Sequence, residues 1–245
     1  MRSIHLLLGL LTATLGQLSA LEPAPAKHPL NFLWLIAEDF SPHLGCYGEP
    51  LVQTPHLDRL AADGMKFTRA FTTAPVCSPS RSAFMTGMYQ TTIGAHHHRS
   101  HLDDGYLLPP PARLITDWIR EAGYFTANLV ELPDSLGFKG TGKTDFNFYL
   151  PTNGTAPNPK DPRNHRSAFD SSRWSDLKTH QPFLAQINFK ETHRPFHGPT
   201  KIQPEQVRVP PIYPDHPVTR TDWARYLDDA CELDRKVGAV LQALQ

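Results

Sequence analysis

Apolar and polar positions follow two different periods along the chain. Mostly apolar segments, which indicate buried strands of a parallel sheet, occur at residues 31–37, 124–129 and 182–189. Apolar stripes of helical period predict helices at residues 54–64, 111–122 and 221–245, and a capping Ser80 or Ser78 predicts a short helix at residues 80–86. Partial alternation of apolar and polar residues predicts one further strand at residues 65–73. Strands that alternate with helices indicate an α/β fold with a mainly parallel sheet sandwiched by helices.

Acidic and imidazole side chains directly follow two of the predicted strands. Glu38 and Asp39 come after the first strand, and Glu191 and His193 follow the strand at residues 182–189. Ligands of open parallel sheets gather at the carboxyl ends of the strands. We therefore expect these polar groups to lie at one edge of the sheet.

The charge balance and the cysteine count exclude two classes of protein. The 24 Lys and Arg residues balance 24 Asp and Glu residues, so no bulk basic field is available to bind nucleic acid. Three cysteines in 245 residues cannot all be paired, which argues against a disulfide scaffold. The 24 prolines, roughly twice the usual share, and the polar stretch at residues 150–180 predict a loop-rich surface with one long excursion. The length fits one domain or part of a larger one.

The N-terminus has the pattern of an export signal. Arg2 precedes an apolar run over residues 6–15, and small residues follow near Ala20. This predicts a signal peptide over residues 1–20, with a cut possible as late as residue 26, and a secreted or periplasmic protein. A buried N-terminal helix is the alternative. No other segment approaches membrane-spanning length, and Asn153 opens a formal glycosylation sequon.

The three cysteines occupy different settings. Cys231 lies on the apolar stripe of the last predicted helix and reads as a small core residue. Cys46 lies in a turn and is expected to be buried, with pairing left open. Cys77 stands where a strand gives way to a helix, where backbone donors and the helix dipole favour an anion. Arg81, one turn further on, adds a planar donor fork suited to sulfate or phosphate.

The segment from Cys77 to Arg81, C-S-P-S-R, is followed by S-A-F-M-T-G-M-Y and resembles the signature of the type I sulfatases. Further segments agree in order with that family: L-G-C-Y-G, T-P-H-L-D-R-L, G-Y-F-T and the terminal R-Y-L-D-D-A-C-E-L-D-R-K-V-G. The resemblance covers nearly all of residues 30–245. It implies an alkaline-phosphatase-like fold, with residues 27–245 as the N-terminal part of a sulfatase catalytic domain.

The resemblance also implies a set of site residues. Cys77 would be oxidised to formylglycine (3-oxoalanine) by a maturation enzyme, and Arg81 and His193 would serve the sulfate and the leaving oxygen. Asp39 and Glu38 would bind a metal together with the modified Cys77. Oxygen ligands suit Ca²⁺ or Mg²⁺, and the resemblance favours Ca²⁺. Relatives usually have two aspartates here, so Glu38 is a departure.

The active-site lysine and a histidine-rich loop complete the predicted site. Relatives show G-K-x-H where this chain has G-K-T-D, so Lys143 is the expected lysine, Asp145 replaces its companion histidine, and Lys139 is the alternative. Substrate contacts are expected from a loop near the mouth of the site, with a metal-binding tract or a solvated loop as the alternatives. That loop includes His96, His97, His98, Arg99 and His101, of which His97, His98 and Arg99 are the expected contacts to an acidic sugar.

Together these residues predict a sulfuric ester hydrolase that acts on a sulfated carbohydrate. A hydrated aldehyde offers two hydroxyls on one carbon, one to attack sulfur and the other to expel sulfate afterwards. Two alternatives stay open: a phosphomonoesterase or phosphonate hydrolase on the same fold, and a non-catalytic carbohydrate-binding fragment.

The C-terminal end of the chain predicts an incomplete catalytic domain. In the family, further metal ligands follow a later strand in a T-S-D-H-G or T-S-D-N-G context, and a second lysine comes later still; neither occurs here. The last predicted helix has no glycine, asparagine or proline to end it. We expect an N-terminal fragment that is inactive alone, with an open sheet edge prone to aggregation.

Overall fold

Four parallel strands form the sheet of the computed structural model, which describes residues 29–151, 163–198 and 200–244. The strands are β1 (Phe32–Ile36), β2 (Phe125–Glu131), β3 (Ser171–Arg173) and β4 (Phe183–Asn188), in the order β1-β4-β2-β3. The helices are α1 (Pro55–Asp63), α2 (Cys77–Thr86), α3 (Ile115–Glu121) and α4 (Pro217–Ala243). Short 3-10 helices are η1 (Gly45–Tyr47), η2 (Asp134–Leu136), η3 (His165–Ala168) and η4 (Trp174–Lys178). The predicted α/β fold with a parallel sheet is confirmed.

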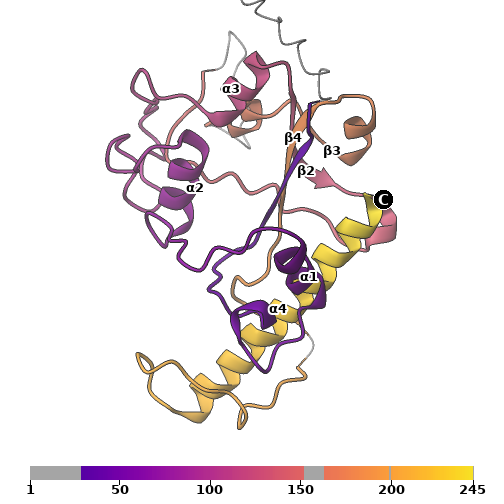
Figure 1. Ribbon diagram of the computed structural model, residues 1–245. Helices are drawn as coiled ribbons and strands as arrows, with labels where there is room; N and C mark the ends of the chain where they lie inside the picture. The colour runs from indigo at the N-terminus through magenta and orange to yellow at the C-terminus, as the bar shows by residue number, and fades with distance from the viewer. Residues whose placement is uncertain (1–28, 152–162, 199, 245) are drawn as a thin grey trace, which may run out of the picture.

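Helices cover both faces of the sheet (Figure 1). On one face α4 packs its apolar stripe, Leu233, Val237 and Val240, onto a core that includes Leu33 and Leu35 of β1. On the opposite face lies a second core. It is formed by Trp34 of β1 with Met85, Ile93, Leu114, Phe146 and Phe148. Alternate residues of β1 thus face opposite cores, which explains why its sequence is continuously apolar.

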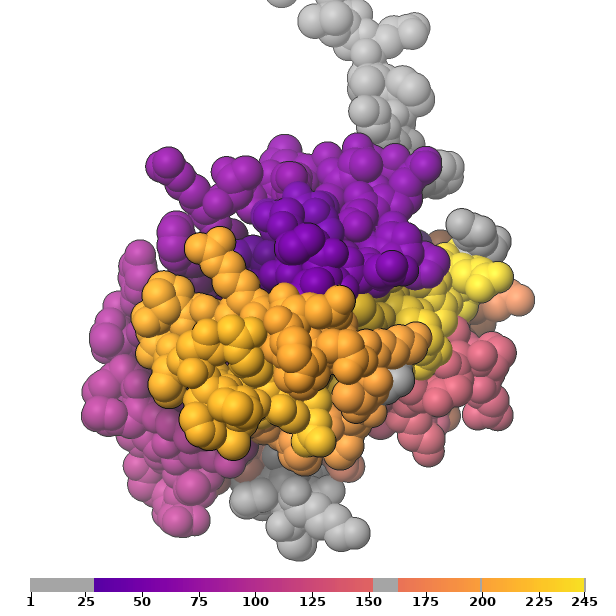
Figure 2. Space-filling model, turned by 90° about the horizontal axis from the view of Figure 1, so that it is seen from below, coloured from indigo at the N-terminus to yellow at the C-terminus, as the bar shows by residue number. Residues whose placement is uncertain are grey.

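A third core joins the segment after β1 to the start of α4. Its buried members are Val52, Ile202, Val207, Ala224, Tyr226, Leu227 and Ala230. Seen from below, the orange stretch near residue 200 and the beginning of α4 lie directly against the indigo N-terminal segment (Figure 2). This packing fixes the loop after β1 between the sheet and α4.

Three acidic residues of α4 accept hydrogen bonds from backbone N–H groups of other segments. Asp228 accepts hydrogen bonds from the backbone N–H groups of residues 201 and 202, and Asp229 from those of residues 197 and 198. Asp234 accepts from His56 and Leu57 in the first turn of α1. Burial raises the pKa of each of the three carboxyls, and the bonds from backbone N–H groups only partly offset it. Through these hydrogen bonds, helix α4 fixes the backbone of the segments that follow β4 and β1.

The carboxyl ends of β1 and β4 meet at one edge of the sheet. Ile36 pairs with Asn188 in register, and each is the last residue of its strand. Beyond that edge, the backbone N–H of Glu38 donates to the carbonyl of Glu191 at 2.9 Å. The polar residues that follow the two strands are thus brought together, as the sequence predicts.

Two predicted elements are wrong. Residues 65–73 form no strand, and Met65, Phe67 and Phe71 are exposed, because no described strand lies beside this segment to accept its hydrogen bonds. The described part of the predicted surface excursion, residues 163–180, instead contains η3, β3 and η4. The sequence of β3, Ser-Ser-Arg, has no apolar pattern, and pairing with β2 determines its conformation. Residues 152–162, including the sequon, lie outside the described residues.

Helix boundaries also differ from the predicted ones. Helix α2 begins at Cys77 rather than near residue 80, α3 begins at Ile115 rather than at residue 111, and α4 begins at Pro217 rather than at residue 221. In α4 the His216 side chain accepts from the Val218 N–H and proline occupies the first turn. In the described part of the chain, no helix has both the length and the hydropathy needed to cross a bilayer.

Candidate active site

Glu38 lies at the centre of the polar cluster beyond β1. Its side chain is only 5% exposed, and two cations from different segments hold it. Arg81 of α2 donates to Oε1 at 2.5 Å, and Lys143 donates to Oε2 at 3.1 Å. Burial by itself would raise the pKa of Glu38, but the charges and hydrogen bonds of Arg81 and Lys143 outweigh it and lower the pKa below its usual value. Glu38 is therefore an ionised carboxylate inside the protein.

Arg81 connects three segments at this edge of the sheet. Besides Glu38, its NH1 group donates to Oδ1 of Asn188 at 2.7 Å and to the carbonyl of Lys143 at 3.0 Å. Asn188 is fully buried at the end of β4, and its Nδ2 donates to Oδ1 of Asn128 on β2. The guanidinium is thus held in one orientation, and the same contact fixes the backbone from which Lys143 extends.

Cys77 is the first residue of α2, and its side chain points to the same cluster. Its Sγ lies 3.8 Å from Oε2 of Glu38, within the range of a thiol–carboxylate hydrogen bond. The preceding residue, Val76, provides no side-chain cap for α2. The first N–H groups of the helix are therefore left for an external acceptor, which is the usual setting of an anion at a helix N-terminus.

His193 completes a group of three potential metal ligands. Ligand atoms of Glu38, Cys77 and His193 lie within 4.8 Å of one another. The imidazole Nδ1 donates to the carbonyl of Arg194 at 2.5 Å, and Nε2 lies 3.8 Å from Oδ2 of Asp39. The Asp39 side chain is 58% exposed and stands at the rim, whereas Glu38 is buried. Of the two predicted acids, Glu38 is therefore the one that lies beside Cys77.

The chemistry of these donors fits a hard cation. Glu38 and Asp39 offer carboxylate oxygens, the ligands that Ca²⁺ and Mg²⁺ prefer. The thiol of Cys77 is a soft donor and does not suit such an ion, but an oxygen at the same position would. Both oxygens of Glu38 are bonded to cationic side chains, so a metal ion would replace Lys143 or Arg81 as their partner.

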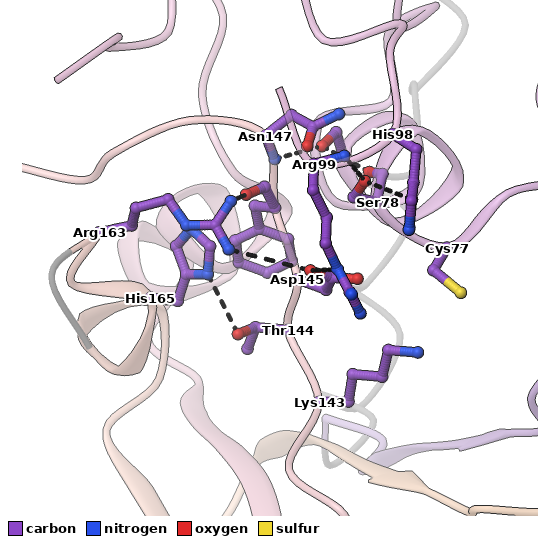
Figure 3. Close-up of polar contacts among 12 residues, drawn as sticks. Cys77, Ser78, His98, Arg99, Lys143, Thr144, Asp145, Asn147, Arg163 and His165 are labelled. Carbon is purple, nitrogen blue, oxygen red and sulfur yellow. Dashed lines mark hydrogen bonds and ion pairs between the residues drawn. The ribbon is translucent and has the colours of Figure 1, made fainter. Parts of the chain in front are cut away.

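The histidine-rich loop lies against the start of α2 (Figure 3). Ser78, fully buried next to Cys77, accepts a hydrogen bond from the backbone N–H of Arg99 at 2.7 Å, and its Oγ lies 3.2 Å from Nδ1 of His98. The carbonyl of His97 accepts from Nδ2 of Asn147 at 2.6 Å. The three predicted substrate contacts are therefore exposed side chains on backbone that is anchored close to Cys77.

The side chains of His101 and His96 make contacts within the loop instead of extending towards a substrate. Both ring nitrogens of His101 are bonded within the loop, to Asp104 and to the carbonyl of Gly94. The His96 ring packs on that of His97. Among the described residues, the histidine loop does not form a three-ligand group of the kind that Glu38, Cys77 and His193 form.

Two residues of the cluster are missing from the sequence prediction. Asn188 could have been found as the polar last residue of a predicted buried strand, since ligands gather at that position. Ser78 gave no signal, because a serine near a helix start is ordinarily a cap. Lys139, the alternative lysine, is exposed, and Lys143 is the one that reaches Glu38. Cys46 and Cys231 are, like Cys77, free and half-buried.

A family model described as Sulfatase matches residues 30–245. The chain belongs to the sulfatase family. The resemblance drawn from the Cys77–Arg81 segment is thus confirmed by a match over almost the whole chain.

Relatives within the family are sulfatases named for different substrates. The chain is 29% identical to an ulvan-active sulfatase of Formosa agariphila, over 88% of this chain and 40% of the relative. It is 30% identical to the N-acetylgalactosamine-6-sulfatase of Sus scrofa, over 98% of this chain and 50% of the relative. The steryl-sulfatase of Mus musculus is 41% identical over 58% of this chain and 24% of its own length. The chain thus spans half or less of the length of these sulfatases.

Solved structures share the fold. A phosphonate monoester hydrolase of Agrobacterium radiobacter matches with a TM-score of 0.63 at 17% identity, covering 88% of this chain and 59% of the hydrolase. A 2-O GAG sulfatase matches with a TM-score of 0.56 at 18% identity, covering 89% and 54% of the two chains. At such low identity these similarities show the fold alone, which is the alkaline-phosphatase-like α/β fold.

Proposed function

We propose that the protein is a sulfuric ester hydrolase that releases sulfate from a sulfated carbohydrate, with Cys77 acting after its oxidation to formylglycine. The observation that supports this most directly is the position of Cys77. It lies at the start of a helix with uncapped N–H groups, 3.8 Å from a buried carboxylate that Arg81 and Lys143 also contact. A plain thiol there would have no second step with which to release sulfate, whereas a hydrated aldehyde would.

Each bond in the proposed cycle has a partner in the site. In a hydrated aldehyde at position 77, one hydroxyl would lose its proton to solvent and attack sulfur while the bond from sulfur to the sugar oxygen breaks. The second hydroxyl would then give its proton to the imidazole of His193, the bond from carbon to the sulfate oxygen would break, and sulfate would leave as the aldehyde re-forms. Arg81 and Lys143, which contact Glu38 in the structure, would hold the sulfate oxygens by charge-assisted hydrogen bonds once substrate is bound.

His193 is the proposed proton donor for the departing sugar oxygen. Its Nδ1 is already bonded to a backbone carbonyl, which fixes the tautomer and leaves Nε2 to face the cluster. A protonated Nε2 gives its proton to the oxygen that leaves sulfur, so that the product departs as an alcohol rather than an alkoxide.

Glu38 and Asp39 would hold a Ca²⁺ ion, with Mg²⁺ as the other candidate. When bound, such an ion lowers the pKa of a nearby hydroxyl and neutralises charge on sulfate oxygens. Glu38 contributes by staying ionised while buried, because Arg81 and Lys143 lower its pKa. Asp39, at the rim beside His193, contributes a second carboxylate.

The substrate class and the biological setting are also proposals. Two relatives bear names of carbohydrate sulfatases, ulvan-active and N-acetylgalactosamine-6, and the exposed His97, His98 and Arg99 offer polar contacts suited to a sugar. We propose that residues 1–20 direct export to the periplasm or the exterior, that residues 27–245 are the N-terminal part of the catalytic domain, and that a formylglycine-generating enzyme acts on Cys77.

The test is to express the protein carrying this chain together with a maturation enzyme and to measure both modification and turnover. We expect peptide mass spectra to show an aldehyde at Cys77 and an aryl sulfate to be hydrolysed faster than the matching aryl phosphate. Cys77→Ser should abolish turnover, whereas the control Cys231→Ser, in a half-buried residue of α4, should not. Turnover with an unmodified Cys77 would disprove the mechanism, and faster aryl phosphate hydrolysis would favour the phosphomonoesterase alternative.

A further inference from the structure

Arg99 is held at both ends beside the proposed nucleophile. Its backbone N–H donates to Oγ of Ser78, the residue after Cys77, at 2.7 Å. Its side-chain Nε lies 3.3 Å from Oδ1 of Asp145, two residues after Lys143. The arginine therefore bridges the start of α2 and the segment that carries the site lysine, and its guanidinium extends towards the side of the site where Lys143 lies (Figure 3).

The outer end of this guanidinium is available to a ligand. The Arg99 side chain is 52% exposed, and within the described part of the chain its two terminal nitrogens make no hydrogen bond. Arg81 and Lys143, in contrast, are already bonded to Glu38. A planar fork with two free N–H₂ groups matches a carboxylate or a sulfate, each of which can accept two parallel hydrogen bonds.

Asp145 pairs with two arginines, so its negative charge does not repel an anion bound by Arg99. Its side chain is 9% exposed and lies between Arg99 and Arg163, whose NH2 is 3.8 Å away. Arg163 is itself fixed, since its NH1 donates to the carbonyl of Phe146 at 2.5 Å. Two guanidinium groups around one carboxylate leave a positive charge at this end of the site.

The backbone conformations of Arg99 and Asp145 indicate that surrounding contacts impose this pairing. Arg99 and Asp145 each have a φ of 50°, in the left-handed region that residues other than glycine seldom adopt. Such conformations persist where surrounding contacts impose them, and they cluster at functional sites. Here those contacts are the Ser78 hydrogen bond on one side and the two arginines on the other.

We propose that Arg99 is a specificity-determining residue that binds a second acidic group of the substrate, a carboxylate or a second sulfate, and that Asp145 is its positioning residue. The inference rests on the proposed function, because it assigns the substrate class of the same site. The preferred substrates are then sulfated sugars with a further negative charge close to the scissile ester, such as sulfated uronic acids or disulfated sugars.

Binding to the full chain tests this directly. Three probes are compared by calorimetry at one ionic strength: a monosulfated neutral monosaccharide, a monosulfated uronic acid and a disulfated monosaccharide. We expect one or both doubly charged probes to bind about 10- to 100-fold more tightly than the neutral sugar sulfate. The tighter of the two identifies the second group as carboxylate or sulfate. Equal affinities for all three, or no binding of any, would overturn the proposal.

Substitutions distinguish a specific contribution of Arg99 to the binding preference from a general effect of positive charge. Arg99→Gln should remove the preference, and Arg99→Lys, which keeps the charge but loses the fork, should reduce it. The matched control is Arg173→Gln on the edge strand β3, where Nε is also bonded to an aspartate, Asp176. It should keep the preference. A preference that survives in both Arg99 variants would refute the assignment.

The role of Asp145 is tested in both backgrounds. Asp145→Asn should weaken the preference several-fold in the wild-type protein and have no further effect in Arg99→Gln, since it acts through that side chain. A merely structural role would lower stability and the affinity for every probe alike in both backgrounds. Sulfate release is measured separately on the matured protein that carries this chain. Absence of hydrolysis there, with the binding preference kept, would refute the proposed function and not the assignment of Arg99; hydrolysis without a preference would refute the assignment of Arg99 alone.

Discussion

Glu38 and Arg81 form a buried ion pair that joins the end of β1 to α2. Oε1 lies 2.5 Å from NH2, and the two side chains are 5% and 12% exposed. A pair so far from water is stabilising only while both partners are present, because removal of one leaves a buried charge without a partner. The pair therefore makes the position of Cys77, at the start of α2, depend on the acid that follows β1.

Glu38→Gln should destabilise the protein markedly. The amide keeps the shape of the side chain but removes the negative charge that Arg81 and Lys143 share. We expect the free energy of unfolding in urea to fall by about 3 kcal/mol. The control is Glu232→Gln, whose partner Arg235 is largely exposed, and it should change by less than about 1 kcal/mol. Equal effects of the two substitutions would contradict the special role of Glu38.

The effect of Glu38 should depend on pH in one direction. Arg81 and Lys143 hold the pKa of Glu38 below its usual value in the folded state, despite burial. A depressed pKa contributes stability above the ordinary pKa of about 4.3, and this is lost as the pH falls through the folded-state value. The difference in stability between wild type and Glu38→Gln should therefore shrink below about pH 4. Urea titrations at several pH values measure it, and a difference that grows on acidification would show the opposite shift.

The strands next to the site could be predicted because their sequences carry the information locally. Residues 31–37 and 182–189 are mostly apolar, and both faces of β1 and β4 are covered in the structure. The motif from Cys77 to Arg81 likewise has a fixed spacing that places both side chains at one end of a helix. The local sequence was sufficient to predict strands that are buried on both faces and side chains that lie one helical turn apart.

Contacts between distant segments could not be predicted in the same way. Residues 171–173 have no strand pattern and join the sheet only through β2, while residues 65–73 have the pattern and find no described partner. The Ser78–Arg99 and Arg99–Asp145 contacts span 21 and 46 residues. Such pairings depend on how loops pack in three dimensions, which residue type and spacing do not encode.

Calcium should stabilise the protein through Glu38 and Asp39. Because Glu38 is already bonded to Arg81 and Lys143, the ion must displace a cation, and we expect weak binding with a rise in Tm only at millimolar Ca²⁺. At ten times the dissociation constant the gain is about 1.4 kcal/mol. Scanning calorimetry with Ca²⁺, then with a chelator, measures it.

Two variants identify the ligands of that ion. Asp39→Asn and Glu38→Gln should each lower the Ca²⁺-dependent rise in Tm. Asp63→Asn, in an exposed pair with Arg59 on α1, should not change it. The same rise in all three proteins would place the ion elsewhere.

Gly142 should be intolerant of alanine because it sets the position of Lys143. Its φ is +64°, and a Cβ there would lie 2.5 Å from Cγ2 of Val130. Gly137 has a similar φ of +72° but open space around it. We expect Gly137→Ala to cost about 1 kcal/mol for the left-handed conformation. Gly142→Ala should cost about 1–3 kcal/mol more for the overlap and should also reduce sulfate release. Equal losses of unfolding free energy in the two variants would show that the space around Gly142 is not limiting.

Asp234 caps a helix that is not its own. Thr54 precedes α1 but makes no side-chain cap bond, and the carboxylate of Asp234 on α4 instead accepts from Leu57 at 2.7 Å and from His56 at 3.4 Å. Asp234→Ala should therefore lower the free energy of unfolding by about 2 kcal/mol. Asp234→Asn, which keeps one accepting oxygen, should cost about half as much. A loss below about 0.5 kcal/mol in the alanine variant would mean that water satisfies the first turn of α1 equally well.

The asparagine variant also reports the charge on Asp234. Burial raises the pKa of this carboxyl more than the bonds from Leu57 and His56 lower it. A raised pKa contributes stability that is present at low pH and lost as the pH rises through the folded-state value. Wild type should therefore lose stability relative to Asp234→Asn as the pH rises above about 4, the opposite of the trend for Glu38→Gln. Both variants are compared with wild type in the same urea titrations. If the two stability differences change with pH in the same direction, the direction of the pKa shift of Glu38 or of Asp234 is wrong.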